Sequence, residues 1–222
     1  MGSIYNRILN QLGDKEIIDK LLSLSKTDLN SLLLELFERQ TNSFTPTQIL
    51  KIYQSNQFGT PSDFDPIKYH TLESQLLTAA QDMDIQTILL SPSAPLGSCS
   101  VFGCVDQNNV ISALRGTETL SDPTNMLAII IAEKLKHKIQ SNISPLHYAT
   151  TARVVRGQKF SGAATYAHFG LFGMVSSGKG TGSYFCENAI LKKHLTYYNE
   201  LFKMQFSAKL SISLRKRGGY TD

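Results

Sequence analysis

Three side chains in the last third of the sequence have the chemistry that a nucleotide requires: Arg153, His168 and Phe172. A guanidinium makes planar, bidentate hydrogen bonds to phosphate oxygens, an imidazole exchanges hydrogen bonds, and a phenyl ring offers an apolar face to a base. Because His168 and Phe172 are four residues apart, a strand would project them from the same face. The spacing predicts a site for an anion joined to a flat ring, provided that Arg153 lies on an adjoining antiparallel strand. An ordinary hairpin with exposed arginines and one paired histidine would carry the same residues.

A second arginine follows closely, and a regular strand cannot place both on one face. Arg153 and Arg156 are three residues apart, whereas side chains on a strand repeat every two residues. We therefore expect one of them inside the site and the other on its rim or in the loop.

A glycine-rich stretch at residues 173–181 is the second candidate for phosphate chemistry. It differs by one residue from the phosphate loop G-x-x-x-x-G-K-[ST], because Gly180 replaces the hydroxyl residue that binds magnesium. Lys179 would hold a phosphate if this interpretation were right. A flexible glycine-serine turn explains the same residues without a ligand.

Other catalytic patterns are missing from the sequence. It contains no G-x-S-x-G elbow for a nucleophilic serine, and its histidines and cysteines do not have the spacing of metal ligands, so we expect no metal site. Cys99, Cys104 and Cys186 cannot all pair with one another and include no C-x-x-C pair. With no signal-peptide pattern at the N-terminus, a reduced, cytoplasmic location is expected.

The composition favours a folded, water-soluble chain with an uneven charge distribution. Of the 222 residues, 41% are hydrophobic and 18% charged, and no uncharged run approaches the length of a membrane span, so we expect no membrane partner. The net charge of +4 hides 11 Lys and Arg against 3 Asp and Glu in residues 145–222. Such a local excess favours an anionic partner, a nucleotide or RNA, or it is only a solubilising surface.

Helices are predicted to precede the candidate site and to alternate with its strands. Leu29, Leu32, Leu33, Leu36 and Phe37 follow a helical stripe that Thr27 or Asp28 could cap. A capping residue followed by proline predicts further helix starts at residues 45–46, 65–66 and 122–123. In the second of these helices, we expect Ile67, Leu72 and Leu76 to face inward. Residues 183–206 predict a last helix.

Strands are predicted mainly in the basic third. Residues 150–156 and 166–175 read as a hairpin with a wide loop, residues 85–90 as a short strand, and residues 206–214 as a strand of strict alternation. Helices with antiparallel hairpins indicate an α+β fold, an antiparallel sheet flanked by helices. Residues 56–65 read as a linker, so we expect a helical N-terminal segment at 1–60 and a core at 61–222.

Several of these segments resemble a known protein family. From Arg153 to Phe172, the sequence resembles motif 2 of class II aminoacyl-tRNA synthetases: an arginine, a variable loop, then [Arg/His]-x-x-x-Phe. The Arg-x-x-Arg-x-Gln portion is similar to the histidyl enzymes, and His168-x-x-x-Phe172 is closer to the phenylalanyl type. Upstream, Leu90-Ser91-Pro92 resembles the first motif, whose proline lies at a dimer interface. Residues 115–119 are similar to the segment beside the amino-acid pocket. The resemblance covers about residues 65–222, and the order of these segments carries it.

The resemblance implies roles for individual residues. Arg153 would act catalytically on the α-phosphate of ATP, with Arg156 and His168 also at the ATP site and Phe172 on adenine. Arg115, Thr117 and Glu118 would border the amino-acid pocket. The activity implied is ATP-dependent formation of an aminoacyl-adenylate and aminoacylation of tRNA, in a phenylalanyl-type enzyme. Its cofactor would be ATP with Mg, and its partners would be an amino acid, tRNA, and a second copy or another synthetase subunit.

Two departures from the family pattern keep a second interpretation open. The acid that normally follows the arginine by two residues is Val155 here, and no Gly-x-Gly-x-Gly-x-[Glu]-Arg pattern of motif 3 occurs up to Asp222. The alternative is a non-catalytic relative, a structural, tRNA-binding or regulatory subunit.

Overall fold

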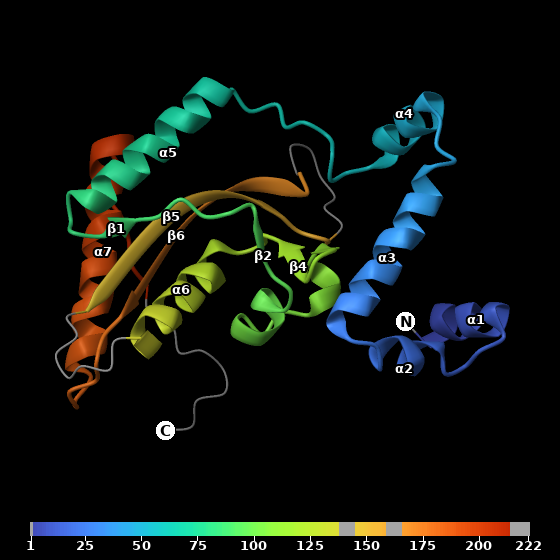
Figure 1. Ribbon diagram of the computed structural model, residues 1–222. Helices are drawn as coiled ribbons and strands as arrows, with labels where there is room; N and C mark the ends of the chain where they lie inside the picture. Colours follow the sequence, from blue (N-terminus) through green and yellow to red (C-terminus); the bar gives the residue numbers. More distant parts are fainter. Residues whose placement is uncertain (1, 138–144, 159–165, 214–222) are drawn as a thin grey trace.

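The computed structural model describes residues 2–137, 145–158 and 166–213 (Figure 1). The helices are α1 (Gly2–Leu12), α2 (Ile17–Leu22), α3 (Lys26–Thr41), α4 (Pro46–Ser55), α5 (Pro66–Gln81), α6 (Pro123–His137) and α7 (Phe185–Phe206), with a π-helical turn η1 (Ser98–Phe102) and a 3-10 turn η2 (Gln107–Asn109). The strands are β1 (Gln86–Thr87), β2 (Ser93–Pro95), β3 (Ser112–Ala113), β4 (Thr117–Thr119), β5 (Leu146–Val155) and β6 (His168–Ser177).

The strands form two small sheets. The first has the order β1-β5-β6, with β1 parallel to β5 and β5 antiparallel to β6. The second is antiparallel, with the order β2-β4-β3. The predicted α+β class is confirmed, since the antiparallel strands β5 and β6 are flanked by helices and preceded by a helical segment (Figure 1).

The hairpin of β5 and β6 is the predicted one, and its register sorts the side chains onto two faces. Thr151 pairs with Phe172, Arg153 with Gly170, and Val155 with His168, so these residues share one face. On this face, Ala149 joins a core cluster with residues of α5 and α7. The opposite face packs against α6 and the second sheet. We call the first face the α5 face.

The predicted helix starts are confirmed for three helices. Thr45 and Gln48 form a capping box at α4, and the Asp65 side chain accepts hydrogen bonds from two amides at the start of α5. Helix α6 begins at Pro123 as expected. Helix α3 is capped by Ser25 rather than by the predicted Thr27 or Asp28, because the helix already begins at Lys26, two residues before the start that a Thr27 cap would give.

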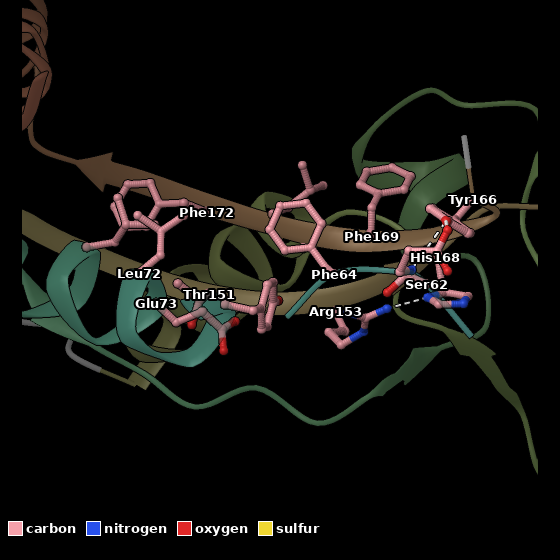
Figure 2. Close-up of a pocket in the computed structure, with 15 residues that line it drawn as sticks. Ser62, Phe64, Leu72, Glu73, Thr151, Arg153, Tyr166, His168, Phe169 and Phe172 are labelled. Carbon is pink, nitrogen blue, oxygen red and sulfur yellow. Dashed lines mark hydrogen bonds between the residues drawn. The ribbon is translucent and has the colours of Figure 1, made fainter. Parts of the chain in front are cut away.

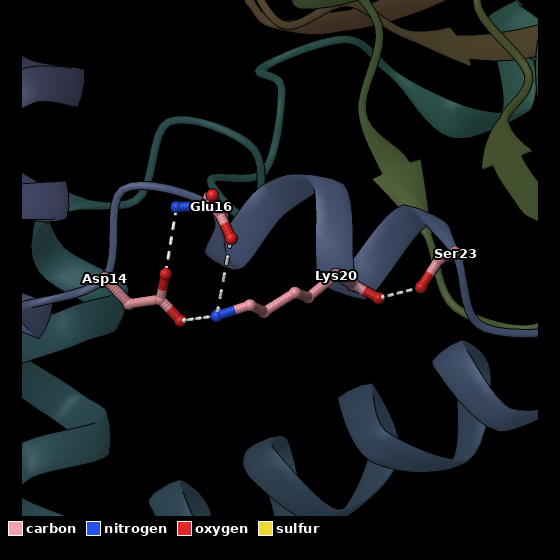
Figure 3. Close-up of polar contacts among 4 residues, drawn as sticks. All are labelled: Asp14, Glu16, Lys20 and Ser23. Atoms are coloured by element: carbon pink, nitrogen blue, oxygen red, sulfur yellow. Dashed lines mark hydrogen bonds and ion pairs between the residues drawn. The ribbon is translucent and has the colours of Figure 1, made fainter.

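The N-terminal helices lie to one side of the main sheet (Figure 1), and α2, α3 and α4 contain no buried residue. Local polar contacts stabilise their ends. Lys20 contacts both Asp14, at 2.8 Å, and Glu16, at 3.9 Å (Figure 3). The hydrogen bonds from Lys20 and the Glu16 amide lower the pKa of Asp14. Residues 56–65 form no helix or strand, and the domain boundary at residue 60 stays a prediction.

The strand predicted at residues 206–214 is wrong over its described part. Helix α7 runs through Phe206, whose ring lies 5.2 Å from that of Phe202, and residues 207–213 form no strand. The Phe202–Phe206 spacing also fits a helix, so the helical pattern prevails over the alternation. Ser207 then ends the helix in a left-handed conformation, with φ of 48°. Leu214 lies outside the described residues.

The strand expected at residues 85–90 is shorter in the structure. It comprises only Gln86–Thr87, and the last hydrogen bond to β5 is the one that the Ile88 amide donates to the Ala149 carbonyl.

In the part of the chain that the structure describes, no helix has the length and apolar character needed to cross a bilayer.

Candidate functional site

A cavity of about 670 Å³ lies between α5 and the α5 face of the hairpin (Figure 2). Helix α5 and the segment before it form one wall, and β5 and β6 form the other. The three residues singled out first in the sequence, Arg153, His168 and Phe172, all line it. The expected convergence of a guanidinium, an imidazole and a phenyl ring on one concave surface is therefore confirmed.

At one end of the cavity, His168 links Arg153 to the segment that precedes α5. A guanidinium only donates hydrogen bonds, so His168 Nδ1 accepts from Arg153 Nη2. His168 Nε2 then carries the ring hydrogen and donates it to the Thr60 carbonyl at 2.6 Å. Arg153 is exposed at the mouth of the cavity, and this chain orients its guanidinium.

Tyr69 from α5 lies against the same guanidinium. The Arg153 guanidinium carbon is 5.4 Å from the centre of the Tyr69 ring, within the range of a cation–π contact. Gly170 makes this approach possible, because a Cβ there would lie 2.5 Å from the Tyr69 hydroxyl oxygen. That hydroxyl is buried and makes no hydrogen bond of ordinary geometry with the described residues. Burial and the nearby Glu73 carboxylate raise the pKa of Tyr69 to about 12, so the group remains a donor.

The other end of the cavity is apolar, with one carboxylate. Phe172 stacks on Tyr197 of α7 with ring centres 5.1 Å apart, and Leu76 packs against the same cluster. Figure 2 shows Leu72, Glu73 and Thr151 near Phe172, whereas Arg153, His168 and Tyr166 lie toward the opposite end. The Glu73 side chain is 21% exposed, and one of its oxygens lies 3.0 Å from Nδ1 of the exposed His70. The cavity thus has a cationic end and an apolar end that carries an acceptor.

The segment before α5 is tied to β6 beside the cationic end. The Tyr166 hydroxyl donates to the Asp63 carboxylate at 2.8 Å and accepts from the Asp63 amide at 3.2 Å. Together with the His168–Thr60 bond, these contacts hold residues 60–64 against the hairpin, where Ser62, Asp63 and Phe64 line the cavity.

Arg156 does not line the cavity. Strand geometry turns it to the opposite face, where its guanidinium carbon lies 5.2 Å from the centre of the Phe169 ring and its Nε donates to the Ser121 carbonyl at 3.2 Å. The prediction that Arg153 and Arg156 would separate is thus confirmed. A role for Arg156 in binding ATP stays a prediction.

The structure does not bring Arg115, Thr117 and Glu118 to the cavity. They belong to the second sheet and the turn before it. Arg115 is exposed with φ of 64°, and its amide donates to Asn30 Oδ1 of α3 at 2.6 Å. Their assignment to an amino-acid pocket stays a prediction.

Glu118 is fully buried and its carboxylate is engaged in structure. It accepts hydrogen bonds from the amides of Gly97 at 2.8 Å and Cys99 at 2.9 Å, and from the Gln107 side chain at 2.9 Å. Burial alone would raise the pKa of Glu118, but these hydrogen bonds hold it below the ordinary value. The carboxylate therefore fixes the η1 turn and the segment around Gln107.

The glycine-rich stretch does not have the geometry of a phosphate loop in its described residues. Lys179 is exposed, and α7 begins only at Phe185, after three successive residues with positive φ, Gly182, Ser183 and Tyr184. A phosphate loop needs its lysine in the first turn of the helix, where the free amides point at the ligand. The lysine and the helix start are six residues apart here.

The sequence pattern did not single out Tyr69 and Glu73, the two polar residues that α5 contributes. Ile67 was expected to face inward, whereas it is 74% exposed. The inward stripe is Tyr69, Leu72, Glu73, Leu76 and Ala80, with the i, i+3, i+4 spacing of one helix face. Polar residues that continue an apolar stripe were the signal that could have identified both.

The chain is similar to known proteins in structure only. No family model and no curated protein matches the chain. One similar solved structure is described as an ATP phosphoribosyltransferase regulatory subunit/histidyl-tRNA synthetase from Bacillus halodurans (16% identity over 65% of this chain and 38% of that one, TM-score 0.47). Another is a pyrrolysyl-tRNA synthetase from Desulfitobacterium hafniense (10% identity over 70% and 52%, TM-score 0.47). A third is a histidyl-tRNA synthetase from a Nostoc species (16% identity over 64% and 34%, TM-score 0.43). The chain thus spans between about a third and a half of the length of these structures.

Proposed function

We propose that this chain is the ATP-binding core of a class II synthetase-like ligase, which activates an amino acid as its adenylate. The observation that carries the proposal is that Arg153, His168 and Phe172, which resemble the family's second motif, line a single cavity. Its size suits a small ligand, since such sites have volumes of about 300–1,000 Å³. The cationic end suits a phosphate and the apolar end suits a base.

Arg153 would perform the main electrostatic work in this reaction. When an amino-acid carboxylate attacks the α-phosphorus of ATP, negative charge develops on the phosphate oxygens as pyrophosphate leaves. A guanidinium that His168 and Tyr69 already orient stabilises this charge without reorganising. His168 would lie beside the phosphates, and Phe172 would contact adenine.

Nucleotide binding is tested by calorimetry with the full chain and MgATP. We expect the Arg153→Ala variant to reduce the affinity at least about tenfold, because a charge-assisted hydrogen bond is lost. Lys179→Ala is the matched control, since Lys179 is exposed and outside the cavity. A loss of binding in Lys179→Ala with normal binding in Arg153→Ala would favour the glycine-rich stretch and overturn the proposal.

Catalysis is tested by amino-acid-dependent exchange of pyrophosphate into ATP. We expect exchange with phenylalanine, as the resemblance of His168-x-x-x-Phe172 to the phenylalanyl type suggests, and none with Arg153→Ala. The proposal includes tRNA as acceptor, a second copy or another synthetase subunit as partner, and a cytoplasmic location. Absence of exchange with every amino acid would reject the enzymatic part of it.

A second candidate is a non-catalytic relative that binds a nucleotide or tRNA for a structural or regulatory purpose. Two observations favour it: Glu118 is fully engaged with Gly97, Cys99 and Gln107, and Val155 offers no polar group where the family has an acid. It predicts that MgATP binds through Arg153 while no amino acid supports exchange. Exchange activity would exclude it.

A further inference from the structure

The cavity carries a carboxylate that the proposed ATP site has not used. Glu73 lies on the inward stripe of α5, four residues after Tyr69 and three before Leu76. Tyr69 contacts Arg153 at the cationic end, and Leu76 packs against the cluster of Phe172 at the apolar end. Glu73 therefore lies between the two ends and next to the apolar one, as Figure 2 shows.

The positions of the other groups fix how a nucleotide would lie. Phosphates belong at the Arg153 guanidinium, which provides the donors and which His168 orients, so a base would lie toward Phe172. Along β5, Arg153 and Thr151 mark the two ends, and they are separated by roughly 6.6 Å at 3.3 Å per residue. A ribose would then span the middle, beside Tyr69, and the edge of the base would reach the α5 wall.

From this arrangement, we infer that Glu73 recognises the exocyclic amino group of the base and so selects adenine nucleotides over nucleotides that have a carbonyl at that position. A carboxylate only accepts hydrogen bonds, so it pairs with an amine and repels a carbonyl oxygen. The inference rests on the proposed ATP site and adds its base specificity.

The other polar groups near the apolar end do not supply this selectivity. Thr151 has a hydroxyl, which both donates and accepts and therefore pairs with either base. The Tyr69 hydroxyl stays protonated at ordinary pH, because its pKa is about 12, so it too can donate or accept. Glu73 is therefore the one group in the described lining of this end that distinguishes an amine from a carbonyl.

The test compares MgATP with MgITP, in which a carbonyl replaces this amino group and the neighbouring ring nitrogen N1 carries a hydrogen. By calorimetry with the full chain, we expect the wild type to bind MgATP about tenfold or more tightly than MgITP. In Glu73→Gln, the amide can donate as well as accept, so the preference should fall to about twofold or less. Glu38→Gln on α3 makes the same chemical change at an exposed position and should keep the wild-type preference.

The outcomes separate this inference from the proposed function. Equal binding of both nucleotides by the wild type overturns the inference alone, as does a preference that survives in Glu73→Gln. Failure of the wild type to bind either nucleotide overturns both. Arg153→Ala should weaken MgATP and MgITP by the same factor, because it acts on the phosphates. The wild-type comparison decides the matter even if Glu73→Gln does not fold.

Discussion

Tyr69 and Tyr197 lie against the same face of the hairpin, toward opposite ends of the cavity, and among the described residues only the Tyr197 hydroxyl has a hydrogen-bond partner. Tyr197, from α7, is 1% exposed, stacks on Phe172 and donates its hydroxyl hydrogen to the Leu76 carbonyl at 2.9 Å. Tyr69, from α5, lies against Arg153 and leaves its buried hydroxyl unpaired among the described residues. Burial raises the pKa of both groups.

The two ends differ in whether the protein itself supplies a hydrogen-bond partner for the buried tyrosine hydroxyl. An unpaired buried hydroxyl costs about 1–3 kcal/mol, which is why such groups usually have partners. At the Tyr197 end, the protein supplies that partner itself. At the Tyr69 end, a ligand in the cavity would supply it, so the two ends should respond differently to mutation and to nucleotide.

The largest effect is expected from Tyr197→Ala. Removal of a fully buried aromatic ring that stacks on Phe172 should lower the free energy of unfolding by about 3–5 kcal/mol. Urea denaturation followed by circular dichroism measures this loss. The control is Tyr166→Ala at the cavity, whose half-buried ring should cost clearly less. Equal losses in the two variants would contradict the comparison.

Gly170→Ala tests how tightly Tyr69 is held against β6. The new methyl group would lie 2.5 Å from the Tyr69 hydroxyl oxygen, so the ring must move away from Arg153. We expect a loss of about 1–3 kcal/mol in unfolding free energy together with weaker MgATP binding. Gly180→Ala is the control, because its nearest atom is 3.9 Å away. Adding Tyr69→Ala should restore most of the stability, and no restoration would argue against the contact.

The site could be predicted from the sequence where local periodicity alone decides geometry. His168 and Phe172 share a face because strands alternate, and Arg153 and Arg156 separate for the same reason. The register that brings Arg153 opposite Gly170 follows from the hairpin. Two strands predicted from the 2-residue alternation were therefore enough to predict that Arg153, His168 and Phe172 lie on one face.

The contribution of α5 could not be predicted in the same way. Which turn of α5 lies over the cavity depends on how the helix packs on the sheet, and Tyr69 rather than Ile67 faces inward. The role of Glu118 depends equally on tertiary contacts, because its partners Gly97 and Cys99 lie in a turn that no periodicity indicates. The alternation at 206–214 failed because Phe206 also fits the helical pattern of α7.

Acidification should affect the Tyr197 end more than the cavity. On the α5 face near α7, Ser176 Oγ lies 2.7 Å from both His147 Nδ1 and His194 Nε2. Burial, Lys193 and, for His147, the charge of His194 lower the pKa of the two histidines below the ordinary value of 6.5. The unfolded chain therefore binds protons first as pH falls, and stability should decrease from just above pH 6.5 down to the folded-state pKa values.

Melting temperatures recorded between pH 7.5 and 5 measure this effect, and we expect a fall of a few degrees in the wild type. His194→Gln should give a flatter profile over the same range, because it removes one of the two titrating groups. A wild-type profile as flat as that of the variant would show that these histidines contribute no pH dependence.

The smallest and most selective comparison removes each tyrosine hydroxyl in turn. Tyr197→Phe loses the hydrogen bond to Leu76 and leaves the carbonyl without that partner, so unfolding free energy should fall by about 1 kcal/mol. Tyr69→Phe loses no hydrogen bond and keeps the ring against Arg153, so we expect unchanged or slightly higher stability without ligand. The sign should reverse with saturating MgATP if the hydroxyl donates to the nucleotide, since the variant then gains less stability from binding. Urea denaturation with and without MgATP measures all four values, and equal losses in the two apo variants would show that the Tyr69 end is as complete as the Tyr197 end.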